Sequence, residues 1–173
     1  LQVINASPGE LTPVFNAIVD RATRLCTADG GGLWLVEGDR ARFSGGQANM
    51  PKAYVEYGSF QDGVQVDYLL GRSGNAEAYL QVADIQALDA YRKGVPFVVA
   101  SADLGRIRTY LGVPLTDEAG SLIGVFTLIR NDVRPFSPSQ IALVQSFAAQ
   151  AQMAMKNARL MQQTQESLER QTA

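Results

Sequence analysis

The chain has 173 residues, of which 46% are hydrophobic and 18% are charged, a composition typical of one soluble globular domain. Its net charge of −2 argues against a nucleic-acid-binding domain, which would display a basic patch. With one cysteine and no histidine, the chain cannot form a zinc site of several Cys or His ligands, a histidine-ligated haem site or an imidazole-dependent catalytic triad.

The first predicted element is an amphipathic helix over Pro13–Thr27, with Thr12 as its N-cap and proline at its first position. The single cysteine, Cys26, lies on the apolar stripe of this helix. A buried thiol is therefore favoured over chromophore attachment or redox sensing. The residues at helical spacing are Leu11, Phe15, Ile18, Val19, Ala22 and Leu25.

Two strands are predicted next. Gly32–Glu37 is a continuous apolar run, as expected for a buried central strand, and the more polar Arg40–Gly46 suits a sheet edge. Side chains alternate along a strand, so Trp34 faces away from Leu33 and Leu35. The sequence leaves open which face would hold a ligand, and whether Trp34 is core or pocket lining.

The segment 47–63 is irregular and carries Met50, Tyr54, Tyr57 and Phe60 among polar residues. We predict a short helix followed by a loop. The aromatic side chains would either cover a cavity or simply pack against the sheet. After it, Val64–Leu69 is a candidate strand.

A β-hairpin is predicted near the centre of the sheet, from two apolar runs, Tyr110–Leu115 and Leu122–Ile129, around a polar connector ending in Gly120. Gly112 and Gly124 interrupt the two runs, where a missing side chain allows a bulge or a close backbone approach.

The last predicted element is a helix over residues 139–171, about 50 Å long at 1.5 Å per residue. Its second half is polar on most sides and would be marginal alone. We therefore expect a homodimer through this helix, the alternative being a frayed tail. The expected dimer seam repeats at spacings of three and four and consists of Val144, Phe147, Ala151, Ala154, Ala158, Met161 and Leu168.

The hairpin and the helix start carry a family resemblance. The runs 106–115 (RIRTYLGVPL) and 124–131 (GVFTLIRN), followed by Arg134-Pro135-Phe136 and Gln140-Ile141, resemble the last two strands and final helix of a GAF domain. More narrowly, the chain resembles the GAF modules that occur in tandem in bacterial multi-domain sensor histidine kinases. It implies an α+β fold: a six-stranded antiparallel sheet with the terminal helices on one face and short helices and loops enclosing a pocket on the other.

The resemblance also implies elements that the residues alone do not settle. It places a short helix at Asn75–Tyr79, a strand at Leu80–Ile85 and helices at Ala87–Lys93 and Pro96–Leu104, although Phe97-Val98-Val99 alone would favour a strand. It divides the chain into the end of a linker at 1–10, a GAF domain at 11–158 and the start of a coiled-coil linker at 159–173.

The family's pocket gives a set of candidate ligand contacts. Asp84 has a structural alternative as a cap, and Arg108 could form a salt bridge or hold an anionic ligand through its guanidinium group. The candidates are Trp34, Phe43, Tyr54, Tyr57, Tyr68, Asp84, Arg108, Tyr110 and Thr127.

Several specialised activities of the family lose support. The cyclic-nucleotide signature keeps Asn131 and Phe136, while Asp132, Gln140 and Ile141 replace its Lys, Asp and Glu. Bilin-binding relatives use a Cys-His pair or nearby histidines, and sulfoxide-reducing relatives use several cysteines. No phosphate-binding GxxxxGK[ST] loop is present in the sequence.

These observations favour a non-catalytic sensory module of a two-component signalling protein. We expect an unidentified small ligand, no certain cofactor, no metal, no nucleic acid and no membrane insertion. The long helix would relay the signal to a downstream histidine kinase, or alternatively a cyclase. A ligand-free dimerisation module remains open, with its cavity filled by aromatic side chains such as Phe126. With no span-length apolar run and no visible signal peptide, we expect a cytoplasmic location, and the start at Leu1 is that expected of a fragment.

Overall fold

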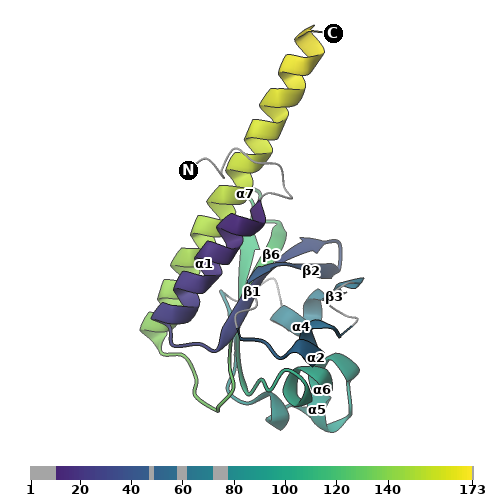
Figure 1. Cartoon of the computed structure of the whole chain (residues 1–173), viewed down its shortest axis with the longest axis vertical. Helices are drawn as coiled ribbons and strands as arrows, with labels where there is room; N and C mark the ends of the chain where they lie inside the picture. The colour runs from purple at the N-terminus through teal and green to yellow at the C-terminus, as the bar shows by residue number, and fades with distance from the viewer. Residues whose placement is uncertain (1–10, 47–48, 58–61, 72–77, 173) are drawn as a thin grey trace.

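A six-stranded antiparallel sheet forms the centre of the computed structural model, which describes residues 11–46, 49–57, 62–71 and 78–172. The strand order is β3-β2-β1-β6-β5-β4, so β1 and β6 occupy the middle (Figure 1). The strands are β1 (Gly30–Glu37), β2 (Arg40–Gly46), β3 (Val64–Gln65), β4 (Leu80–Val82), β5 (Thr109–Thr116) and β6 (Leu122–Arg130).

The first and last helices, α1 (Thr12–Leu25) and α7 (Pro138–Thr172), pack side by side against one face of the sheet (Figure 1). Their apolar stripes meet a continuous core that includes Phe15, Leu33 and Phe126, each at most 2% exposed. This arrangement confirms the fold expected from the sequence. We call this side of the sheet the helix face.

Short elements cover the opposite face, which we call the cavity face (Figure 1). None of these helices is long enough to be stable without the sheet beneath it. They are α2 (Lys52–Val55), α4 (Val66–Leu70), the 3-10 turn η3 (Ile85–Ala87), α5 (Asp89–Arg92) and α6 (Pro96–Asp103).

Strand β6 shows how one apolar run serves both faces. Phe126 and Leu128 belong to the core on the helix face, whereas Val125 and Ile129 belong to clusters on the cavity face. The alternation follows from the pleat of the strand. A run buried on both faces therefore reads as continuously hydrophobic, as β6 does.

The hairpin turn confirms the predicted connector. Asp117 accepts hydrogen bonds from the backbone N–H groups of Ala119 and Ser121, and Gly120 adopts a φ of +84°, which favours glycine. A Cβ atom at Gly124 would lie 2.7 Å from the carbonyl oxygen of Trp34, so this glycine permits the close approach of β1 and β6.

Helix α7 begins at a capping box that the sequence analysis missed. The Ser137 hydroxyl accepts from the N–H of Gln140, and the Gln140 side chain accepts from the N–H of Ser137. Pro138 follows the cap at the first helical position, where its missing N–H costs nothing.

Arg130, at the end of β6, connects the ends of both long helices to the sheet. It is 1% exposed and donates to the carbonyls of Cys26 and Thr27 at the end of α1 and to those of Arg134 and Pro135 before α7. Its guanidinium carbon lies 3.9 Å from the centroid of the Phe136 ring. Burial lowers the pKa of Arg130 from its ordinary value.

The position of α7 corrects the predicted dimer seam. Five seam residues are buried against the chain's own α1 and sheet, so they cannot also form a contact with a second chain. These five are Val144, Phe147, Ala151, Ala154 and Ala158. Met161 and Leu168 are 43% and 54% exposed. The C-terminal part of α7 extends beyond the sheet (Figure 1). Among the described helices, none is sufficiently long and apolar for a membrane span.

Two local predictions are wrong. The N-cap of α1 is Leu11 rather than Thr12, and Thr12 is already helical. The run 64–69 forms only two strand residues before turning into α4, because packing of Leu69 and Leu70 against the cavity face overrides the strand preference of a short apolar run. The predicted linker end at 1–10 and most of the helix at Asn75–Tyr79 lie outside the described residues.

Candidate functional site

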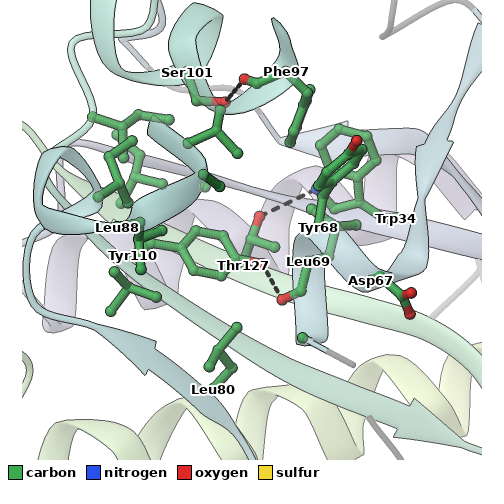
Figure 2. Close-up of a pocket in the computed structure, with 18 of the residues that line it drawn as sticks. Trp34, Asp67, Tyr68, Leu69, Leu80, Leu88, Phe97, Ser101, Tyr110 and Thr127 are labelled. Atoms are coloured by element: carbon green, nitrogen blue, oxygen red, sulfur yellow. Dashed lines mark hydrogen bonds between the residues drawn. The ribbon is translucent and has the colours of Figure 1, made fainter. Parts of the chain in front are cut away.

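A cavity of about 290 Å³ lies between the sheet and the short helices of the cavity face (Figure 2). Strands β1, β5 and β6 form its floor, and α4 and α6 contribute to its walls. Its lining is predominantly apolar and rich in aromatic rings, as expected of a small-molecule site. The side chains of this lining include Trp34, Phe43, Tyr54, Tyr68, Leu69, Leu80, Phe97, Ser101, Tyr110 and Thr127.

Trp34 and Thr127 are joined across the floor of the cavity. The indole N–H of Trp34 donates to Thr127 Oγ1 at 3.3 Å, and the Thr127 hydroxyl donates to the carbonyl of Gly32 at 3.2 Å. The Trp34 ring also meets the Phe43 ring edge to face, with centroids 5.2 Å apart. These contacts fix the orientation of the indole in the floor.

Tyr110 reaches from β5 toward α4. Its hydroxyl donates to the carbonyl of Leu69 at 2.7 Å, so the sheet and the cavity wall are directly connected (Figure 2). A Cβ atom at Gly112 would lie 2.6 Å from that carbonyl and 2.7 Å from the Tyr110 hydroxyl. The first glycine of the hairpin therefore leaves room for this contact.

A third polar contact lies where α6 borders the cavity. The Ser101 hydroxyl donates to the carbonyl of Phe97, and the Tyr54 hydroxyl lies 2.8 Å from Ser101 Oγ. Burial raises the pKa of Tyr54 to about 12 and that of Tyr110 well above its ordinary value. Both phenols are therefore neutral near pH 7.

Acidic and basic side chains are scarce in the described lining, where Asp67 is the single Asp, Glu, Lys or Arg residue. Asp67 is exposed, and its carboxylate points away from the other labelled side chains in Figure 2. Among the residues that the structure describes, no group of three or more His, Cys, Asp or Glu side chains is arranged to hold a metal ion.

Three of the nine predicted contacts lie outside this lining. Asp84 and Arg108 bind each other through two hydrogen bonds of 3.0 and 2.8 Å, and Asp84 also caps η3 by accepting from Gln86 N. The hydrogen bond from Arg108 lowers the pKa of Asp84. Tyr57 is half-buried and packs beside the cavity-face core without lining the cavity. Asp84 is therefore a helix cap and Arg108 forms a salt bridge, the structural alternatives to ligand binding.

The other six predicted contacts do line the cavity, namely Trp34, Phe43, Tyr54, Tyr68, Tyr110 and Thr127. Sequence reasoning missed Leu69, Phe97 and Ser101. Phe97 and Ser101 are four residues apart on α6, a spacing that places both on one helix face, but the apolar run around them resembled a strand.

Comparison with known protein families gives the same fold as the structure. A family model described as "GAF domain" matches residues 10–156, which is most of the chain. The chain belongs to the GAF domain family. In this GAF domain, Cys26 is fully buried in the core of the helix face, where burial raises the pKa of its thiol. The thiol therefore lies on the side of the sheet opposite the cavity.

Solved structures show the same fold in proteins of differing roles. A domain of a protein assigned as a two-component sensor histidine kinase from Sinorhizobium meliloti 1021 is 21% identical, with a TM-score of 0.65 over 85% of this chain and 91% of that one. The blue-light-absorbing PixJ GAF domain from Thermosynechococcus elongatus is 14% identical, with a TM-score of 0.68 over 93% and 94%.

An enzyme shares the fold as well. The free methionine-R-sulfoxide reductase from Neisseria meningitidis is 15% identical, with a TM-score of 0.65 over 92% of this chain and 87% of that one. A search of curated proteins found no match. At these identities the likenesses show the fold alone, so function must be argued from the site.

Proposed function

We propose that this GAF domain is a non-catalytic sensory module that binds a small molecule in its cavity and relays the event through α7. The proposal depends on one observation: the same β-hairpin both lines the cavity and contacts α7. Strands β5 and β6 contribute Tyr110 and Thr127 to the cavity. The end of β5 beside the hairpin turn contacts α7, where Thr116 N donates to Gln152 Oε1 at 3.0 Å.

An ionic contact strengthens the connection between hairpin and helix. Glu118, in the turn, forms ion pairs with Lys156 at 3.3 Å and Arg159 at 3.2 Å. A ligand that shifts the hairpin would therefore act on α7 close to the point where the helix leaves the domain. Such coupling requires the ligand to bind the two helix positions with different affinity.

The described lining also supports a binding role over a catalytic one. The buried hydroxyls of Ser101, Tyr110 and Thr127 already donate to backbone carbonyls. An active site would require a nucleophile or a base with a perturbed pKa and access to a substrate. The lone thiol of Cys26 does not meet that requirement, because it is buried on the helix face.

The relay would end in a dimer whose contact retains only the exposed C-terminal end of the predicted seam. Apolar side chains on the outer side of α7 are exposed, including Met153 at 58%, Leu160 at 44% and Leu168 at 54%. A second copy of the chain placed along this side would cover them and support the projecting half of the helix. A histidine kinase is the proposed output, and a nucleotide cyclase is the alternative.

Native mass spectrometry of freshly purified protein tests the binding role. An added small-molecule mass that disappears in the Leu80→Trp variant is expected, because the larger ring would occupy the cavity. A bare chain in every preparation, together with unchanged spectra for Leu80→Trp, would favour the ligand-free dimerisation module.

Sedimentation tests the dimer. Truncation after Asn157, or Leu160→Glu, is expected to convert a dimer into a monomer, because each removes apolar contact from the projecting helix. Gln163→Glu, which adds the same charge at an exposed polar position, is the control and should leave the mass unchanged. A monomer in the unmodified chain would remove the dimer from the proposal.

A further inference from the structure

The chemical class of the ligand can be inferred from how the cavity's hydrogen bonds are already used. Four donors of the described lining are engaged: Trp34 Nε1–H with Thr127, and the hydroxyls of Thr127, Tyr110 and Ser101 with backbone carbonyls. Because the Ser101 hydroxyl donates to Phe97, the Tyr54 hydroxyl must be the donor in its contact with Ser101 Oγ. The buried hydroxyls therefore offer no donor to a ligand.

Acceptor capacity remains at the centre of the cavity. A hydroxyl oxygen has two lone pairs. Thr127 Oγ1 uses one for the Trp34 N–H, and Tyr110 donates to Leu69 and keeps both. Figure 2 shows Thr127 near the middle of the labelled set, with Tyr110 on one side of it and Trp34 on the other. A ligand N–H or O–H group placed there would find an acceptor.

An anion would find no compensation in the same lining. No Lys or Arg side chain is among the described residues that line the cavity, and the charged side chain at its edge, Asp67, is acidic. Burying an unpaired charge is strongly unfavourable. Tyr68, which is 39% exposed, carries the remaining hydroxyl of the lining.

Size and shape favour a planar molecule of two rings. The cavity of about 290 Å³ is roughly twice the 150 Å³ that accommodates a benzene molecule. Its lining is rich in aromatic rings, and two of them, Tyr68 and Phe97, pack against each other with centroids 5.5 Å apart and an interplanar angle of 31°. Aromatic rings attract an aromatic ligand in offset-stacked or edge-to-face arrangements.

We infer that the cavity selects an uncharged, mostly apolar aromatic molecule of about two rings that carries a hydrogen-bond donor, and that it rejects anions. This inference rests on the proposed binding role and narrows it. Thr127 Oγ1 and Tyr110 Oη accept the ligand's donor, and the aromatic rings hold its plane.

Three naphthalenes of similar size test the class at pH 7: 2-naphthol, the nearly isosteric 2-methylnaphthalene without a donor, and the anionic 2-naphthoate. Their Kd values can be measured from the change in naphthalene emission or by displacement. 2-Naphthol is expected to bind about tenfold or more tightly than 2-naphthoate. Tighter binding of 2-naphthoate, abolished by Leu80→Trp, would overturn the class while leaving the cavity as a binding site.

Variants test the two acceptors. Tyr110→Phe and Thr127→Val should each weaken 2-naphthol relative to 2-methylnaphthalene by about three- to tenfold, since the methyl probe reports any change of cavity shape. Tyr68→Phe is the matched control and should leave that ratio unchanged. An unchanged ratio in both variants would overturn the donor preference.

If no naphthalene binds to folded protein, as judged by circular dichroism, the ligand class is overturned. The binding role then depends on the native mass measurement: an added mass there would show that the cavity takes a different class. No added mass would end both inferences.

Discussion

The two faces of the sheet differ in how completely they are filled. The helix face packs Phe126 and Leu128 against α1 and α7, and its core is continuous from one helix to the other. The cavity face uses the alternate residues of the same strand, Val125, Thr127 and Ile129, and leaves a hollow of about 290 Å³ above Thr127 and Ile129. One strand thus forms part of a close-packed core and of a binding cavity.

The difference assigns a separate task to each face. Close-packed cores resist changes in volume, so the helix face can hold α1 and α7 as a rigid pair. The short helices on the cavity face have little internal stability and are the part that can adjust around a ligand. A sensor needs both properties, and the hairpin of β5 and β6 joins them.

Breaking the arginine that closes the helix face should have the largest effect. Arg130→Met keeps most of the side-chain volume but leaves the carbonyls of Cys26, Thr27, Arg134 and Pro135 without their charged donor. We expect a loss of about 3–4 kcal/mol in the free energy of unfolding, measured with urea.

The control for Arg130 is Arg24, whose side chain is 70% exposed in a surface pair with Asp20. Arg24→Met should change the free energy of unfolding by no more than about 0.5 kcal/mol. Equal losses in the two variants would mean that Arg130 does not hold the helix ends together.

Enlarging an alanine on each face tests the filled and hollow faces directly. Ala151 on α7 is fully buried, so Ala151→Leu should cost about 1–3 kcal/mol by overpacking. Ala90 on α5 lines the cavity and is half-buried, so Ala90→Leu should stay within about 1 kcal/mol.

The free energies of unfolding of Ala151→Leu and Ala90→Leu, measured with urea, show whether the cavity is open in solution. A cost at Ala90 as large as that at Ala151 would show that the cavity collapses in solution. In that event the two faces would be equally close-packed, and the cavity would not be available to a ligand.

How far the sequence predicts this molecule also differs between the faces. The helix face follows from local patterns, because α1 has a helical apolar stripe and the hairpin runs are long and bounded by turn residues. The cavity face depends on tertiary packing. Residues 66–70 form a helix although their run favoured a strand, since only the folded sheet makes Leu69 and Leu70 buried.

The candidate site shows the same limit. Large aromatic side chains such as Trp34 and Tyr110 could be selected by residue type, because they are the natural lining of an apolar cavity. The hydrogen bond from Tyr110 to the Leu69 carbonyl could not be predicted from the sequence, since the two residues are 41 positions apart. The ion pair between Asp84 and Arg108, which are 24 positions apart, could not be predicted either. Because the two side chains bind each other, neither lines the cavity.

The smallest expected effect concerns the ion pair at the end of the cavity face. Arg108 donates to Asp84, and that hydrogen bond is the main cause of the lowered pKa of the carboxyl group. Because the pKa is lower in the folded chain than the roughly 3.9 of an unfolded aspartate, the pair stabilises the fold above that pH. The contribution is lost as the pH falls through the lowered value.

The Asp84→Asn variant isolates this contribution. Unfolding by urea should show the variant less stable than the parent at pH 7, and the gap should narrow at pH 3, where the carboxyl group binds a proton more readily in the unfolded parent than in the folded ion pair. Asp89→Asn, in an exposed pair with Arg92 whose aspartate side chain is 81% exposed, is the control.

Arg130 on the helix face donates to backbone carbonyls, which do not titrate, so Arg130→Met should show a stability loss that is nearly the same at both pH values. If the gap for Asp84→Asn instead stayed constant with pH, the side chain would act as a neutral cap of η3, and the ion pair would contribute nothing to the difference between the faces.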